Sequence, residues 1–243
     1  MKVLNMGAGV QTTAMLLEFW EDYDLVIMAD TGDEQEETYY YVEKYLKPFC
    51  ESKGLEWVTV TEKKYGSLMK HCLERKILPI PSRRWCTHEH KVKPILKELR
   101  KRGATKKNPI TSCIGISIDE AHRANFNTSV QYQKLEYPLV DRKISRKDCY
   151  DIIEKHGFPV PPKSGCDFCM FFSKNHFRKL AKNSPERFQK IVDMEKNSYS
   201  YGKYYLKGKY PLQMILDNTS LDEFNEYEDS CDSGHCMKFQ LVW

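Results

Sequence analysis

Short apolar runs alternate with helical patterns along the first half of the chain, and this alternation limits the folds it can adopt. The apolar runs are Lys2–Met6, Leu25–Ala29, Trp57–Val60 and Ile114–Ile118. Segments with helical periodicity lie between them, at Gln11–Trp20, Glu34–Ser52, Tyr65–Lys76 and Glu89–Arg102. Apolar runs without polar alternation are typical of strands that are covered on both faces. We therefore predict an α/β protein with a doubly wound, mostly parallel sheet.

The alternation of apolar runs and helical patterns ends at about Pro138. Ser145 predicts the N-cap of a helix over Arg146–His156, with Gly157 just beyond its end. Ser184 followed by proline predicts another helix start. We predict an α/β domain over residues 1–140 and a smaller helical, cysteine-containing lobe over residues 141–243.

The composition favours a protein that does not cross a membrane. No apolar run reaches the roughly 20 residues that a membrane span needs, and we find no signal peptide, so we expect a cytoplasmic protein. The net charge of +4 permits an anionic ligand. Residues 199–210 alternate tyrosines with lysines, which could stack bases and contact phosphates; a tyrosine-rich loop beside a solvated helix is the simpler interpretation.

A glycine loop follows the first apolar run directly, and a helical pattern begins at Gln11. Backbone N–H groups at a helix N-terminus stabilise an anion, and glycines allow a phosphate to approach the backbone. A tight strand–helix turn is the alternative, because neither the dinucleotide fingerprint nor the Walker A pattern is matched. The predicted phosphate-binding residues, including two threonines as hydroxyl donors, are Asn5, Met6, Gly7, Ala8, Gly9, Gln11, Thr12 and Thr13.

A second polar segment, Ala29-Asp30-Thr31-Gly32, ends the second apolar run. Ligands of open parallel sheets bind beyond the carboxyl ends of the strands, so this segment and the glycine loop should converge. A carboxylate there could hold a ribose, a magnesium ion or an amino group. The alternative is a helix N-cap with an acidic first turn.

Together these segments resemble the PP-loop superfamily of ATP pyrophosphatases and of reductases of phosphoadenosine phosphosulfate (PAPS) and adenosine phosphosulfate (APS). Residues 7–12 correspond to its Ser-Gly-Gly-x-Asp-Ser loop, with Gln11 where the family has Asp. Residues 29–32 resemble its second-strand motif, residues 84–94 its Cys…Lys…Pro segment, and residues 115–123 its Gly-x-Arg-x-x-Glu-(Ser/Ala)-x-Arg segment. Residues 145–149 and 161–169 are similar to segments of PAPS-reductase-like proteins of phages and bacteria.

This resemblance implies an adenine-nucleotide-alpha-hydrolase-like fold that binds ATP, PAPS or APS with Mg²⁺. The implied chemistry is adenylation with sulfur insertion, or sulfonucleotide reduction. Gly115 and Glu120 would contact the nucleotide, Arg123 its phosphate or the substrate's anionic group, and Lys91 the charge that develops on the phosphates. Cys231 would be a redox thiol. The alternative function is a nucleotide- or nucleic-acid-binding module with a structural metal. Further partners that we consider are a sulfur-donor protein and a second copy of the chain.

Nine cysteines in a chain without a secretion signal favour metal or redox chemistry over disulfides. A Cys-x-x-Cys pair at Cys166 and Cys169 is ambiguous between zinc, an iron–sulfur cluster and a redox dithiol. The resemblance to APS reductases implies a 4Fe–4S cluster held by these two and Cys86, with Cys149 as candidate fourth ligand. The alternative is a structural Zn²⁺ site that joins Cys166 and Cys169 to Cys231 and Cys236.

Overall fold

The computed structural model describes residues 1–81, 84–124, 130–208 and 210–217. The chain forms two compact units. Unit 1 comprises Met1–Glu62 and His88–Gly165, and unit 2 comprises Lys63–Thr87 and the chain from Cys166 onward. These units do not follow the predicted boundary at residue 140, because residues 63–87 join the C-terminal part and residues 141–165 join the sheet.

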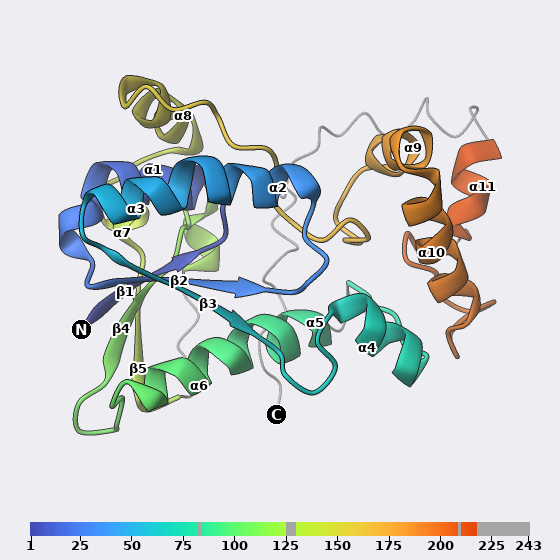
Figure 1. The fold of residues 1–243 in the computed structure, drawn as a ribbon, viewed down its shortest axis with the longest axis horizontal. Coiled ribbons are helices and arrows are strands. Elements are labelled where there is room, and N and C mark those ends of the chain that lie inside the picture. The colour runs from blue at the N-terminus through green and yellow to red at the C-terminus, as the bar shows by residue number, and fades with distance from the viewer. Residues whose placement is uncertain (82–83, 125–129, 209, 218–243) are drawn as a thin grey trace. The chain divides into compact units, whose positions relative to one another are not determined.

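Unit 1 is built on a five-stranded sheet in the order β3-β2-β1-β4-β5, in which every neighbouring pair is parallel (Figure 1). The strands are β1 (Lys2–Met6), β2 (Leu25–Asp30), β3 (Glu56–Thr61), β4 (Ile110–Cys113) and β5 (Gln133–Glu136). The chain moves outward from β1 to β3 and then returns to the other side of β1 with β4. The loops after β1 and β4 therefore flank the topological switch point, where open sheets of this Rossmann-like kind bind ligands. The predicted α/β class with a parallel sheet is confirmed.

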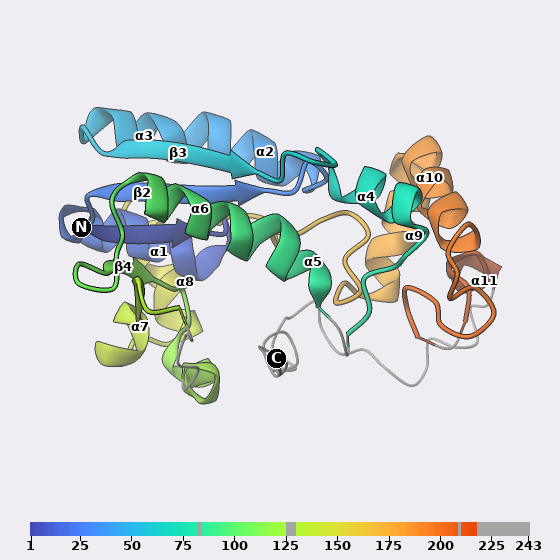
Figure 2. The ribbon, with the colours of Figure 1, turned by 90° about the horizontal axis from the view of Figure 1, so that it is seen from below.

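Helices cover both faces of this sheet, as Figures 1 and 2 show. Alternate residues of β1 explain why: Leu4 packs into one hydrophobic cluster with α1 (Val10–Phe19), and Val3 packs into another with Leu99 of α6 (Lys93–Lys101). Side chains of β2 alternate in the same way. Successive apolar residues such as Val3-Leu4 of β1 and Leu25–Ala29 of β2 are therefore needed, which is the pattern that the sequence carries.

The remaining helical segments of unit 1 connect the strands. The predicted helix over residues 34–52 is confirmed as one helical run with a π-helical middle. The predicted cap at Ser145 is confirmed as a capping box with Asp148, which stabilises a helix by about 0.5–2 kcal/mol. The segments are η1 (Trp20–Asp22), α2 (Glu36–Tyr41), η2 (Val42–Leu46), α3 (Lys47–Ser52), η3 (His88–Val92), η4 (Ile118–Arg123), α7 (Pro138–Asp141) and α8 (Arg146–Lys155).

Two strands differ from the expectation. The predicted strand at Ile114–Ile118 is wrong, because β4 ends at Cys113 and Ile118 begins a 3-10 helix. The sequence of β4 is not apolar enough to predict a buried strand, because it contains Thr111 and Ser112. Ser112 is nevertheless fully buried. The edge strand β5 was not predicted, because it contains Gln, Lys and Glu around a single leucine.

Unit 2 consists of helices packed around one hydrophobic cluster that includes Phe168, Phe177, Ile191 and Leu206. Its helices are α4 (Leu68–Arg75), α5 (Trp85–Thr87), α9 (Lys174–Asn183), α10 (Pro185–Lys196) and α11 (Leu212–Asp217). In neither unit is any described helix both long and apolar enough to span a bilayer.

Candidate functional site

The glycine loop connects β1 to the N-terminus of α1, as predicted. Ala8 has a left-handed backbone with φ of 55° and is completely buried. Gly9 is the N-cap, with an extended backbone and no side-chain cap. The first intrahelical bond runs from Thr13 N to Gly9 O, so the N–H groups of residues 10–12 have no partner within the helix. Such N–H groups are suited to bind an anion.

The hydroxyls of the two threonines, which are predicted phosphate donors, are directed into the protein in this structure. Thr12 Oγ1 accepts a hydrogen bond from Gly7 N at 3.3 Å and donates to Gly9 O at 3.2 Å. Its only hydroxyl proton is therefore used to close the loop. Thr13 is completely buried, so its hydroxyl faces the protein interior. The anion-binding capacity of this loop lies in its backbone.

The two other predicted residues here lie on β1. Met6 is buried in the hydrophobic core, so its side chain is structural. Asn5 is partly buried, and its Oδ1 has no hydrogen-bond partner among the described residues. A buried acceptor without a donor costs free energy, so this oxygen is suited to receive a donor from a ligand.

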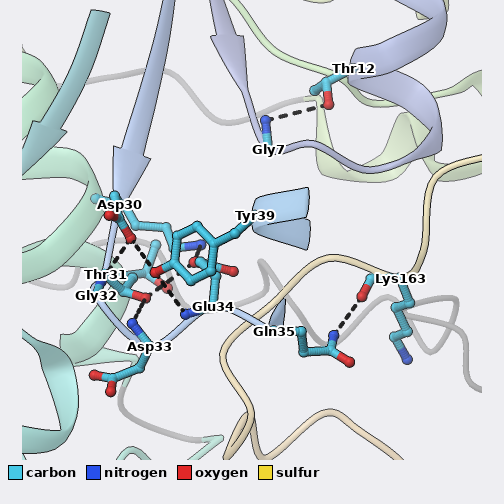
Figure 3. A network of polar contacts seen from close by, with 12 residues as sticks. Gly7, Thr12, Asp30, Thr31, Gly32, Asp33, Glu34, Gln35, Tyr39 and Lys163 are labelled. Atoms are coloured by element: carbon cyan, nitrogen blue, oxygen red, sulfur yellow. Dashed lines mark hydrogen bonds and ion pairs between the residues drawn. The ribbon is translucent and has the colours of Figure 1, made fainter. Parts of the chain in front are cut away.

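Asp30 lies at the end of the neighbouring strand β2, where its carboxylate is held in place. Asp30 Oδ1 accepts hydrogen bonds from Gly32 N at 2.8 Å and from the Tyr39 hydroxyl at 2.7 Å (Figure 3). The same hydroxyl accepts from Glu34 N at 3.3 Å. Burial and the bond to Asp30 raise the pKa of Tyr39, so its proton stays in place. Tyr39 was not predicted, because nothing distinguishes it from the adjacent tyrosines in the sequence.

Lys91, a predicted catalytic residue, is paired with the buried side chain of Glu34. Lys91 Nζ lies 2.9 Å from Glu34 Oε1, and Thr31 Oγ1 donates to the same oxygen at 3.2 Å. The carboxylate is almost fully buried, whereas the lysine is partly exposed. Glu34 therefore fixes the ammonium of η3 next to the end of β2. From the sequence, Glu34 is only the first residue of the helical segment Glu34–Ser52.

Gly115, in the loop after β4, approaches the N-terminus of α1 very closely. A Cβ atom on Gly115 would lie 2.6 Å from Thr12 Cγ2 and 3.2 Å from Thr12 N. A larger residue would force Thr12 to shift. Gly115 thus brings the loops after β1 and β4, on the two sides of the switch point, into contact.

Gln11, Glu120 and Arg123 form a chain of polar contacts between α1 and η4. Gln11 Nε2 donates to Glu120 Oε2 at 3.3 Å, and Arg123 Nη1 donates to Glu120 Oε1. Glu120 and Arg123 are both largely buried. An aspartate at position 11 would place a second carboxylate beside Glu120, which like-charge repulsion disfavours. The glutamine therefore has a structural partner in this chain.

A proline-rich segment, residues 159–165, lies alongside both loops. Gln35 Nε2 donates to Lys163 O at 2.6 Å, and Gln35 N donates to Gly165 O at 3.0 Å (Figure 3). A Cβ on Gly9 would lie 3.1 Å from Ser164 Oγ. Lys163 and Ser164 thus join the candidate site, although the sequence assigned them only to the turn before the cysteines.

The cysteines separate between the two units. Cys149 lies in α8, in the core of unit 1, where burial raises its pKa to about 12. Metal binding requires the thiolate, so this environment does not favour Cys149 as a ligand. Cys86, Cys166 and Cys169 belong to unit 2 and border its hydrophobic cluster. Cys231 and Cys236 lie outside the described residues.

Cys166 and Cys169 form a tight turn, in which Cys169 N donates to Cys166 O at 2.8 Å. Within the described ranges, no three or more His, Cys, Asp and Glu side chains are grouped so as to hold a metal ion. The turn thus places two cysteines of the predicted set around one backbone hydrogen bond, and the described residues alone do not complete a ligand set.

Comparison with protein-family models and with curated protein sequences gives no match. We therefore infer the function from the residues of the two units alone.

Proposed function

We propose that unit 1 is a PP-loop domain that binds an adenine nucleotide, and that the protein is a PAPS-reductase-like enzyme of sulfur chemistry. The observation that carries this proposal is the contact between Gly115 and Thr12. It joins the loops after β1 and β4 at the switch point, beside backbone N–H groups at the start of α1.

Each part of the proposed site has a chemical task. The N–H groups of residues 10–12 would hold a phosphate, and the Asp30 carboxylate would contact the ribose, Mg²⁺ or an amino group. Lys91, fixed by Glu34, would neutralise charge that develops on the phosphates, and Arg123, fixed by Glu120, would contact an anionic group.

Two reactions suit such a site. In adenylation, a carbonyl oxygen of the acceptor attacks the α-phosphorus of ATP, pyrophosphate leaves, and a sulfur nucleophile then displaces AMP. In sulfonucleotide reduction, a thiolate attacks the sulfate sulfur of PAPS or APS, the S–O bond breaks, and the nucleotide leaves with its phosphate. A second thiol then attacks the S-sulfonated thiol, which releases sulfite and leaves a disulfide. The pairing of Gln11 with Glu120 instead favours the second candidate function, a binding module that keeps the fold with altered catalysis.

Lys91→Ala is the variant that tests catalysis. We expect it to lower the rate of AMP formation from ATP, or of sulfite formation from PAPS, by about 10²- to 10³-fold, because an electrostatic contact to the transition state is lost. The measurement is product release from labelled nucleotide in the presence of Mg²⁺. Lys93→Ala is the matched control, because Lys93 is exposed and pairs with Glu89.

Two results would change the proposal. Failure of the wild-type protein to bind ATP, PAPS or APS in calorimetry would refute a nucleotide site. Binding without formation of AMP, pyrophosphate, ADP or sulfite, with sulfur acceptors and thiol reductants supplied, would support the binding module.

We further propose that Cys86, Cys166 and Cys169 hold a 4Fe–4S cluster, with structural zinc as the alternative. The support is the chemistry of the donors: three thiols in unit 2, two of them in one turn. Protein purified without oxygen should contain iron and sulfide and be brown, and Cys169→Ser should lose both. Cys50→Ala is the control, because Cys50 is a buried core residue of unit 1. Stoichiometric zinc without colour would select the alternative, and protein without either metal would refute both.

A further inference from the structure

The net positive charge of the protein lies in unit 2, which contains 18 Lys and Arg and 12 Asp and Glu, a net charge of +6. Within it, residues 63–87 and 166–217 contain 17 Lys and Arg but 6 Asp and Glu, and residues 218–243 are acidic. Unit 1 contains 20 Lys and Arg and 22 Asp and Glu, a net charge of −2. A basic region of this kind attracts polyanions and accelerates their association.

A long loop joins α10 to α11 (Figure 2), and several of its aromatic side chains are exposed. Tyr199 and Tyr204 are 79% and 62% exposed, and Tyr201 and Tyr210 are exposed as well. We call this segment, residues 197–208 and 210, the tyrosine loop. Tyrosine offers a flat apolar face and a polar tip, and the residues that the structure describes leave large parts of these rings exposed.

The tyrosine loop is held in a defined conformation. Glu195, which is buried at the end of α10, accepts hydrogen bonds from Leu206 N at 2.8 Å and from Leu212 N at 2.7 Å. Tyr199 N donates to Lys76 O at 2.9 Å, which attaches the start of the loop to the end of α4. A surface that is already ordered loses less conformational entropy when it binds a ligand.

Lysines accompany the exposed rings. Lys76 Nζ lies 5.6 Å from the centre of the Tyr199 ring, and Lys203 is exposed within the loop itself. Lys207 has a different task, because its ammonium donates to the carbonyl oxygens of Met170 and Phe172. The surface thus combines cations for phosphates with aromatic faces for bases.

We propose that the tyrosine loop binds single-stranded nucleic acid. Unpaired bases can stack on exposed tyrosine rings, whereas the bases of a duplex are already stacked on one another. The lysines of this surface would contact the phosphate backbone, and the net charge of +6 of unit 2 would attract the strand. This inference does not depend on the nucleotide site of unit 1, and it describes a second binding surface.

The test is the affinity of the full chain for labelled oligo-dT and oligo-U strands of about 20 nucleotides, measured by fluorescence anisotropy. Tyr199→Ala and Tyr204→Ala should each weaken binding about 5- to 150-fold, because a base stack is lost. Tyr199→Phe and Tyr204→Phe should bind within about twofold of wild type, because phenylalanine keeps the stacking face. Tyr40→Ala is the matched control, since Tyr40 is 57% exposed but lies in unit 1.

Salt dependence tests the cationic part separately. Lys76→Gln and Lys203→Gln should each reduce the slope of log affinity against log salt by about 0.7, whereas Lys106→Gln in unit 1 should not change it. Thermal unfolding of each variant checks that the fold is retained. The proposal is overturned if neither strand binds, if a duplex of the same length binds as tightly as the strands, or if folded alanine variants of Tyr199 and Tyr204 bind like wild type.

Discussion

Replacing Glu120 by alanine is expected to lower the free energy of unfolding by about 3–5 kcal/mol. Glu120 is the acceptor for both Arg123 and Gln11, and the Glu120 and Arg123 side chains are only 8% and 12% exposed. Removing the carboxylate leaves a guanidinium in a poorly hydrated place without its counter-charge. The measurement is urea unfolding followed by circular dichroism.

A matched control is available in the same unit. Arg102 pairs with Glu56 near the surface, where the Glu56 side chain is 54% exposed. Glu56→Ala should therefore cost at most about 1 kcal/mol, because solvent screens such pairs. Glu120→Gln keeps one acceptor oxygen and should fall between the two. Equal costs for Glu120→Ala and Glu56→Ala would show that Glu120 does not anchor the chain of contacts to Arg123.

Gly115→Ala is expected to cost about 1–3 kcal/mol of stability, because the added methyl group overpacks the switch point. The new Cβ would lie 2.6 Å from Thr12 Cγ2 and 3.2 Å from the backbone nitrogen of Thr12. The side-chain methyl of Thr12 can turn away, but its backbone nitrogen can move only with the start of α1. We therefore also expect nucleotide affinity to fall at least about tenfold, since a misplacement of about 1 Å is costly in such sites.

Gly7→Ala is the matched control, because it adds the same methyl group to the glycine loop without overpacking it. A Cβ on Gly7 would meet nothing closer than Thr12 Oγ1 at 3.9 Å, and Gly7 is not among the glycines with positive φ. Its stability should stay within about 0.5 kcal/mol of wild type. Thermal unfolding and nucleotide titration of both variants are the measurements. If Gly115→Ala unfolds and binds like wild type, the loops after β1 and β4 are not in the contact that we describe.

The sequence predicts β1 and β2 well, because both faces of these strands are covered and most of their positions are apolar. It does not predict β4, because Ser112 is polar although it is buried. It does not predict β5, because this strand lies at the edge of the sheet and needs few apolar residues. Burial at those positions depends on neighbouring strands that are distant in the sequence.

The candidate site follows the same rule. Glycines and an aspartate mark the loops after β1 and β2, so both could be located from local sequence alone. The roles of Glu34 and of the segment 159–165 could not, because their contacts arise only when distant parts of the chain meet. Tyr39 contacts Asp30 locally, but nothing in the sequence distinguishes it from the tyrosines beside it. Gln11 departs from the loop motif of the family, and the sequence does not explain why. The reason is its hydrogen bond to Glu120, which lies far away in the sequence.

The division of the chain into units has a consequence for its biosynthesis. Residues 63–87 leave the ribosome long before the chain from Cys166 onward, although both belong to unit 2. Leu68 and Cys72 of α4 pack in one cluster with Phe168 and Ile191, so their apolar surface stays uncovered until the later segment is made. Unit 1, which needs residues up to 165, can complete its sheet first. The nascent protein therefore carries a folded sheet with an exposed hydrophobic helix, a species that is prone to aggregate or to recruit chaperones until synthesis ends.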